Sequence, residues 1–302
     1  MGHSHSHDHG HSHSANKKAL FISFLCITTF MIIEVIGGFL TNSLALLSDA
    51  GHMLSDSAAL GLSLVAFIIG EKAATGKNTF GFRRFEILAA FFNGIALLAI
   101  SIYILWEAYH RFFEPQSVSA GMLYIASLGF LVNVIVAWIL MKGDTHDNLN
   151  MKSALLHVFG DLLGSVGAII AGLLILFFDW SYADPIASVI VSFLILNSGW
   201  RVTKDSFHIL MEGKPHHINF ERVEIQLKNL PGVSNVHDLH VWTLTSDLPL
   251  LSCHLVVDET VDRDSLLQQA SALLLHEFNL KHTTIQIEGA HSKIQETENY
   301  CN

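Results

Sequence analysis

Six long apolar stretches, all before residue 204, constrain the fold of this chain more than any other feature. A hydrocarbon layer about 30 Å thick needs roughly 20 apolar residues for each spanning helix, and each stretch meets this requirement. A soluble core is not expected, because 51% of the residues are hydrophobic and 15% are charged, against roughly 25% charged in soluble domains. We expect membrane-spanning helices near residues 19–40, 44–70, 86–112, 118–141, 153–178 and 183–203.

The lysine and arginine residues between these stretches predict the orientation of the helices. Cytoplasmic connections carry an excess of both residues, and here they gather on one side, with Arg111 on the other. Both termini are therefore expected in the cytoplasm. Short connections and the lack of a signal-peptide pattern favour a multi-pass protein of a bacterial plasma (inner) membrane. The favoured side holds Lys17, Lys18, Lys72, Lys77, Arg83, Arg84, Lys142, Lys152, Arg201 and Lys204.

Beyond residue 204 the composition changes to that of a small soluble domain. Charged residues return, apolar runs shorten, and Pro215 and Pro231 interrupt the chain. Periodicity predicts helices over 218–230 and 263–278 and strands over 233–245, 250–258 and 283–288, an order typical of an open-faced α+β sandwich. The predicted domains are a histidine-rich cytoplasmic tail (1–18), a six-helix transport domain (19–204), a cytoplasmic domain (205–290) and a disordered C-terminal tail (291–302).

Ionisable side chains inside the predicted membrane helices are the strongest indication of function. Each costs about 2.5 to 3.5 kcal/mol to insert, so each is a candidate for a functional site. A His-x-x-x-Asp spacing occurs twice, as His52 and Asp56 in the second helix and as His157 and Asp161 in the fifth. Residues four apart share one face of a helix, so each motif presents an imidazole and a carboxylate in one direction. Since the two helices run in opposite directions, Asp56 and Asp161 should both lie roughly 12 Å from the cytoplasmic surface.

Two nitrogen and two oxygen ligands form a donor set that suits tetrahedral zinc. Magnesium and calcium prefer more oxygen ligands and monovalent copper prefers sulfur, whereas cadmium, cobalt and nickel accept the same donors as zinc. We therefore expect zinc as the substrate, with cadmium or cobalt as further substrates. The alternative is that the aspartates cap or pair with polar groups in the bundle and that the histidines are ordinary core residues. Asp49, near the outer end of the second helix, is expected in a supporting shell or at the mouth of the site.

Protons and metal compete for the same histidine nitrogen, because only neutral imidazole binds a metal. This competition predicts metal–proton antiport. One rival function is a membrane metalloenzyme, but no His-Glu-x-x-His motif occurs and four protein ligands leave no open position, so no enzyme is expected. The other rival is a metal sensor anchored in the membrane, and an anchor needs no paired ionisable residues at this depth.

Five segments make the sequence similar to the cation diffusion facilitator family, and within it to zinc-type bacterial cobalt-zinc-cadmium efflux transporters. The resemblance covers nearly the whole chain. It implies a homodimer through cytoplasmic and membrane domains, alternating access driven by inward proton flow, and a ferredoxin-like cytoplasmic domain. It also implies that His at position 52 goes with zinc and cadmium in preference to iron and manganese. The segments are Leu47–Asp56, Phe80–Glu86, His157–Asp161, Ala183–Pro185 and His237–Trp242.

The resemblance implies a second metal site in the cytoplasmic domain, formed by His237, His254 and Glu288, where zinc is expected as a regulatory ligand. Gln286 stands where some members carry a further histidine. If this site is absent, the two histidines are ordinary strand residues. A metal site that some members hold between the second and third helices is not expected, because residues 71–84 contain no histidine. We expect His240 at the surface.

Alternating histidines characterise the N-terminal tail. This polar pattern cannot bury a core but can bind metal loosely, so we expect it to gather ions on the cytoplasmic side. The alternative, a purification tag, usually has consecutive histidines. The tail histidines are His3, His5, His7, His9, His11 and His13.

The three cysteines form no Cys-x-x-Cys pair, so neither a disulfide framework nor a thiolate zinc site is expected.

Overall fold

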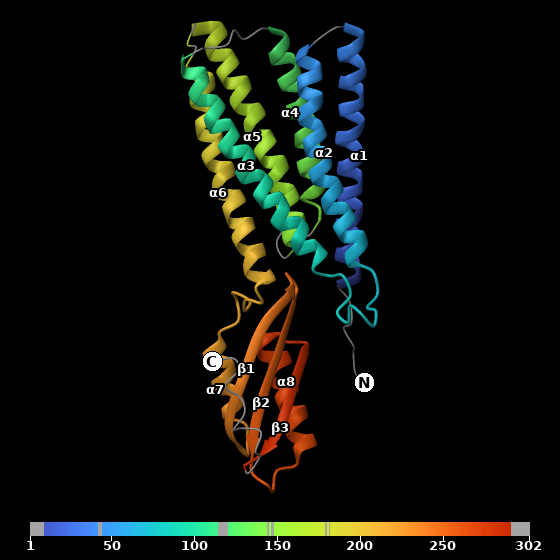
Figure 1. Ribbon diagram of the computed structural model, residues 1–302, viewed down its shortest axis with the longest axis vertical. Coiled ribbons are helices and arrows are strands. Elements are labelled where there is room, and N and C mark those ends of the chain that lie inside the picture. The colour runs from blue at the N-terminus through green and yellow to red at the C-terminus, as the bar shows by residue number, and fades with distance from the viewer. Residues whose placement is uncertain are drawn as a thin grey trace. The chain divides into compact units, whose positions relative to one another are not determined.

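The computed structural model describes residues 9–41, 44–113, 120–143, 145, 148–178, 180 and 182–290. Contacts divide the chain into two compact units, Met1–Phe207 and His208–Asn302. In the described residues, six long helices run alongside one another (Figure 1). They are α1 (His9–Thr41), α2 (Leu44–Gly70), α3 (Phe85–Phe113), α4 (Ala120–Leu140), α5 (Leu149–Phe178) and α6 (Ala183–Leu210).

The length and composition of these helices fit a membrane domain. Helices α2 and α4 contribute the shorter apolar segments Asp56–Gly70 and Ser127–Leu140. Large apolar side chains such as Ile102 and Trp106 are exposed, as expected for a surface that faces lipid. Within the described residues, four segments are long and apolar enough to cross a bilayer, namely Asn16–Ile33, Phe85–Phe113, Leu149–Phe178 and Pro185–Leu210.

Two helices extend further than their apolar runs. Helix α1 begins at His9 rather than near 19, and α6 continues to Leu210 rather than ending near 203. Hydropathy marks the part of a helix that needs lipid, whereas backbone hydrogen bonds can continue into water. The backbone of α1 therefore takes in part of the histidine-rich tail; His3, His5 and His7 lie outside the described residues. The other four helices begin and end within four residues of the expected positions.

Small residues let α3 and α6 pack closely. A Cβ atom on Gly94 of α3 would lie 3.0 Å from the backbone nitrogen of Thr203 in α6. A Cβ atom on Gly199 of α6 would lie 3.0 Å from the Cβ atom of Leu97 in α3. Glycine at such positions allows two membrane helices to approach backbone to backbone. The packing of α3 on α6 therefore depends on the absence of side chains at this crossing.

Buried polar side chains tie α2, α3 and α5 together. Asn93 Nδ2 of α3 donates to Ser63 Oγ of α2 over 3.0 Å, and Asn150 Nδ2 of α5 donates to the Ser63 carbonyl over 2.9 Å. Asn148 Nδ2, just before α5, donates to Glu86 Oε2 of α3 over 2.9 Å. Polar groups without water need such partners, and interhelical bonds of this kind are worth about 0.6 kcal/mol each on average in membrane proteins. They fix how α5 lies against α2.

The second unit has the expected helix-strand-strand-helix-strand order. Asp262 caps α8 by accepting the N–H groups of Asp264 and Ser265, and Asn279, with φ 55°, ends it. In the described residues the sheet has three strands in the order β1-β2-β3, with β1–β2 antiparallel and β2–β3 parallel. The elements are α7 (Phe220–Lys228), β1 (Val233–Thr245), β2 (Leu248–Val257), α8 (Arg263–Phe278) and β3 (His282–Gly289).

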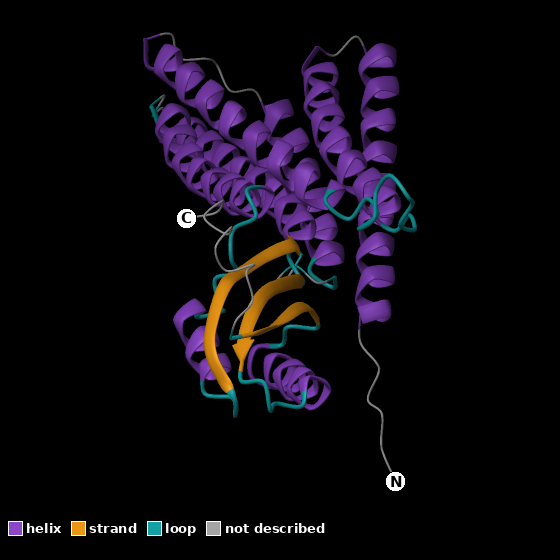
Figure 2. Ribbon diagram, turned by 60° about the horizontal axis from the view of Figure 1, so that its bottom comes forward, coloured by secondary structure: helices purple, strands orange, loops and turns teal. Residues whose placement is uncertain are grey.

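One apolar core joins both helices to the same face of the sheet. Alternate residues of β2 enter this core, among them Cys253 and Leu255, together with Val223 of α7 and Leu274 of α8. Figure 2 shows the sheet with the helices beside it. Since successive side chains of a strand point to opposite faces, His254 lies on the other, open face. The result is the open-faced α+β sandwich that the pattern predicts.

Candidate metal sites

Three of the four expected ligands of the membrane site lie together. Asp56 of α2 and His157 and Asp161 of α5 each offer one ligand atom, and these atoms lie within 4.8 Å of one another. His157 Nε2 is 3.2 Å from Asp56 Oδ1 and 4.0 Å from Asp161 Oδ2. Helices α2 and α5 contact each other directly. A cation at the centre would meet one nitrogen and two carboxylate oxygens, a donor set that suits zinc.

The burial of this cluster favours a bound cation. The side chains of Asp56 and His157 are each 3% exposed, and that of Asp161 is 15% exposed. Among the described residues, Asp56 Oδ2 and His157 Nδ1 are buried and have no hydrogen-bond partner. Leaving such an atom unpaired costs about 1 to 3 kcal/mol, and more for a charged group. Two carboxylates beside one imidazole would gain most from a positive ion.

The second helix also carries His52 and Asp49, and their side chains lie outside the described part of the structure. The backbone of both residues belongs to α2, with His52 one turn before Asp56. The structure therefore describes three members of the predicted four-ligand site. His52 as the fourth ligand and Asp49 as a supporting residue stay predictions.

A second cluster lies on the open face of the sheet. His237 of β1 pairs with His254 of β2, and His254 pairs with Gln286 of β3. Glu288 comes two residues after Gln286 and therefore lies on the same face as the two histidines. His254 Nδ1 lies 3.0 Å from Glu288 Oε1, and His237 Nε2 lies 3.5 Å from Glu288 Oε2. Their ligand atoms lie within 4.8 Å of one another.

The donors on the open face fit a divalent metal. Glu288 is 4% exposed, and its Oε2 atom is buried without a hydrogen-bond partner among the described residues. Two imidazoles and one carboxylate are a donor set that zinc accepts. Gln286 Nε2 donates to Glu288 Oε1 over 2.8 Å, so it holds the carboxylate. Cys253 points into the apolar core on the opposite face, so it cannot complete this set.

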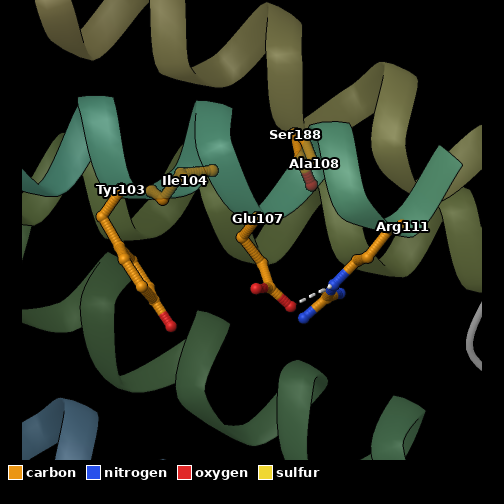
Figure 3. A pocket seen from close by; sticks show the side chains of 6 residues that line it. All are labelled: Tyr103, Ile104, Glu107, Ala108, Arg111 and Ser188. Carbon is orange, nitrogen blue, oxygen red and sulfur yellow. Dashed lines mark hydrogen bonds and ion pairs between the residues drawn. The ribbon is translucent and has the colours of Figure 1, made fainter. Parts of the chain in front are cut away.

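One pair of ionisable residues in a membrane helix was not singled out from the sequence. Glu107 and Arg111 lie one turn apart on α3 and form an ion pair of 3.0 Å beside a pocket of about 180 Å³, which Ser188 of α6 also lines (Figure 3). Their i,i+4 spacing is the signal that could have revealed them. Since the two charges neutralise each other, this pair has no excess negative charge with which to attract a cation.

Family profiles match both units of the chain. The profile described as "Cation efflux transmembrane domain" matches residues 20–211, and the one described as "Cation efflux protein, cytoplasmic domain" matches residues 215–290. The chain belongs to the cation efflux family. It is therefore a multi-pass membrane transporter of the cation diffusion facilitator type, and not an enzyme.

Relatives in bacteria share about half of the residues along most of the cation efflux chain. A protein of Bacillus subtilis (strain 168), "Cadmium, cobalt and zinc/H(+)-K(+) antiporter", is 54% identical over 91% of this chain and 89% of its own. "Zinc transporter ZitB" of Yersinia pestis is 47% identical over 92% and 89%. "Metal cation efflux system protein CzcD" of Cupriavidus metallidurans is 42% identical over 90% and 87%. Each of these three names records a protein that handles metal cations.

Proposed function

We propose that this chain exports zinc from the cytosol in exchange for protons, with cadmium or cobalt as further substrates. The transport site consists of Asp56, His157 and Asp161, with His52 as the fourth ligand. The observation that carries the proposal is the meeting of three ligand atoms from α2 and α5 within 4.8 Å of one another. The names of the Bacillus subtilis and Yersinia pestis relatives, which record zinc transport, support the choice of metal.

Proton exchange follows from the chemistry of the ligands. An imidazole that binds a proton gives up the metal, because both use the same nitrogen. When the site opens to a more acidic outside, protons replace the ion at His157 and His52, helped by the carboxylates. When it opens to the cytosol, zinc displaces them again. The name of the Bacillus subtilis relative, which records protons and potassium as counter-ions, is consistent with this exchange.

We propose the following topology. All six long helices span a bacterial inner membrane, with the boundaries 1–18, 19–204, 205–290 and 291–302 between tail, transport domain, cytoplasmic domain and C-terminal tail. Both termini are cytoplasmic, and the α-β-β-α-β domain is a ferredoxin-like fold. The profile that matches the cytoplasmic domain carries the name ZT_dimer, which supports a homodimer through this domain. We extend the interface to the membrane helices.

We also propose that His237, His254 and Glu288 bind zinc as a regulatory ligand. Zinc bound there would hold three strands together, because each residue comes from a different strand. A site that fills only at raised cytosolic zinc would couple transport to the metal load.

Purified protein in vesicles that enclose a zinc-sensitive dye tests the transport proposal. We expect zinc flux in the native chain to rise with an imposed pH gradient and to fall at least about 10- to 100-fold in Asp161→Ala, since even residues that only support ligands cost this much. Glu107→Gln is the matched control, because it removes a carboxylate from another membrane helix and leaves an amide oxygen for Arg111.

Equal flux in the native chain and Asp161→Ala would show that the site is elsewhere. A zinc flux that does not change with the pH gradient would contradict proton coupling. The same experiment with a potassium gradient shows whether potassium is the counter-ion instead.

A further inference from the structure

Asp238 occupies an irregular position in β1, beside the cytoplasmic metal ligands. Its φ of 48° is in the left-handed region that few residues other than glycine adopt. Pairing with β2 shifts here, since His237 faces His254 while His240 faces Ser252. Three steps along β1 thus match two along β2, which is a β-bulge with one extra residue. The bulge brings His237 and His240 to the same face, although regular alternation would separate them.

The extra residue places a carboxylate between two imidazoles. Asp238 Oδ1 lies 2.7 Å from His240 Nε2, and Asp238 Oδ2 lies 3.7 Å from His254 Nε2. The other ring nitrogen of His254, Nδ1, lies 3.0 Å from Glu288 Oε1. His254 therefore has the metal-site carboxylate on one side of its ring and Asp238 on the other.

We propose that Asp238 is a positioning residue for the cytoplasmic metal site. A histidine that binds a metal through one nitrogen carries its hydrogen on the other, and a carboxylate that accepts this hydrogen fixes both the tautomer and the ring orientation. Asp238 does this for His254, keeping Nδ1 toward Glu288, and His240 holds the Asp238 carboxylate in turn. This inference rests on the metal binding proposed above for His237, His254 and Glu288.

The distances suit a support that tightens on metal binding. At 3.7 Å, Asp238 and His254 are within ion-pair range, and roughly 0.7 Å of closure would give a hydrogen bond. The competing explanation is that Asp238 only forms the bulge, since aspartate and asparagine tolerate the left-handed region. Asp238→Asn separates the two, because asparagine keeps the shape and this tolerance but not the charge.

The test measures zinc affinity of the full-length protein by competition with a chromogenic chelator. To leave the cytoplasmic site alone, the background carries Asp161→Ala and serine at the six tail histidines. We expect Asp238→Asn to weaken zinc binding roughly 10- to 100-fold, the cost typical of lost outer-shell partners. Asp258→Asn is the matched control, because it removes a charge from an exposed position of the same domain and should leave the affinity unchanged.

Two further measurements separate positioning from other roles. At saturating zinc, X-ray absorption should count the same ligands in Asp238→Asn as in the parent, and the metal-free proteins should unfold at the same temperature. Unchanged affinity in Asp238→Asn, or a loss that accompanies a lower unfolding temperature of the metal-free form, would overturn the inference. Glu288→Gln decides the underlying site: if it leaves zinc binding intact, the site itself is wrong and the role of Asp238 falls with it.

Discussion

At the scale of single residues, the spacing of polar side chains singled out three residues that lie close together in the structure. The repeated His-x-x-x-Asp pattern placed Asp56, His157 and Asp161 on facing helices, and the structure brings their ligand atoms together. Asp238 could not be predicted in the same way. Its position depends on a bulge: the apolar residues of β1 change their spacing here, from Val236 to Leu239 to Val241, and only the pairing with β2 shows where the extra residue lies.

The thiol of Cys253 gives a residue-scale prediction in the cytoplasmic domain. Burial raises its pKa from 9.0 to about 12. Because the thiolate is the reactive form, the native protein at pH 8 should alkylate at this residue roughly a thousandfold more slowly than the unfolded chain. Iodoacetamide labelling, followed by mass spectrometry of the peptide that contains Cys253, measures this ratio with and without urea.

The same pKa shift determines how the stability of the folded protein changes with pH. The folded state disfavours the thiolate, so the contribution of Cys253 to stability is complete below about pH 9 and is lost as the pH rises toward 12. Rapid alkylation of the native protein at pH 8 would contradict the buried placement of this thiol.

At the scale of elements, apolar stretches predicted the six long helices, and the period of the sequence predicted the helices and strands that follow in the second unit. It gave β1 and α8 without error, since turn residues and caps mark their ends. The ends of α1 and α6 were missed because apolar composition reports contact with lipid and does not record where a helix stops in water. The close crossing of α3 and α6 was also missed, because a glycine in the sequence of a membrane helix does not indicate which other helix packs against it.

The crossing of α3 and α6 provides a pair of matched glycine variants. A methyl group on Gly94 would meet the backbone of Thr203 at 3.0 Å, whereas one on Gly164 of α5 has open space. We expect Gly94→Ala to destabilise the protein by about 1 to 3 kcal/mol through overpacking. Gly164→Ala should be neutral or stabilising by up to about 1 kcal/mol, because alanine favours the helix. Thermal unfolding in detergent compares the two, and equal unfolding temperatures would refute the close crossing.

At the scale of the whole molecule, each of the two units carries one of the two metal sites that we propose. The membrane unit holds two carboxylates and an imidazole where lipid-spanning helices meet, and the cytoplasmic unit holds a second set of donors on an open sheet face. In our proposal, the first set exchanges zinc for protons, and the second responds to the zinc concentration in the cytosol. Separate sites allow one to be changed while the other is measured.

Locating the bound ion tests the transport site most directly. Anomalous diffraction at the zinc edge, from crystals of the native chain and of Asp161→Ala grown with zinc, shows where the metal lies. We predict a peak between α2 and α5, about 2.0 to 2.2 Å from ligand atoms of Asp56, His157 and Asp161, and no such peak in the variant. A native peak elsewhere in the membrane unit, with these three side chains turned away from it, would contradict the proposed transport site.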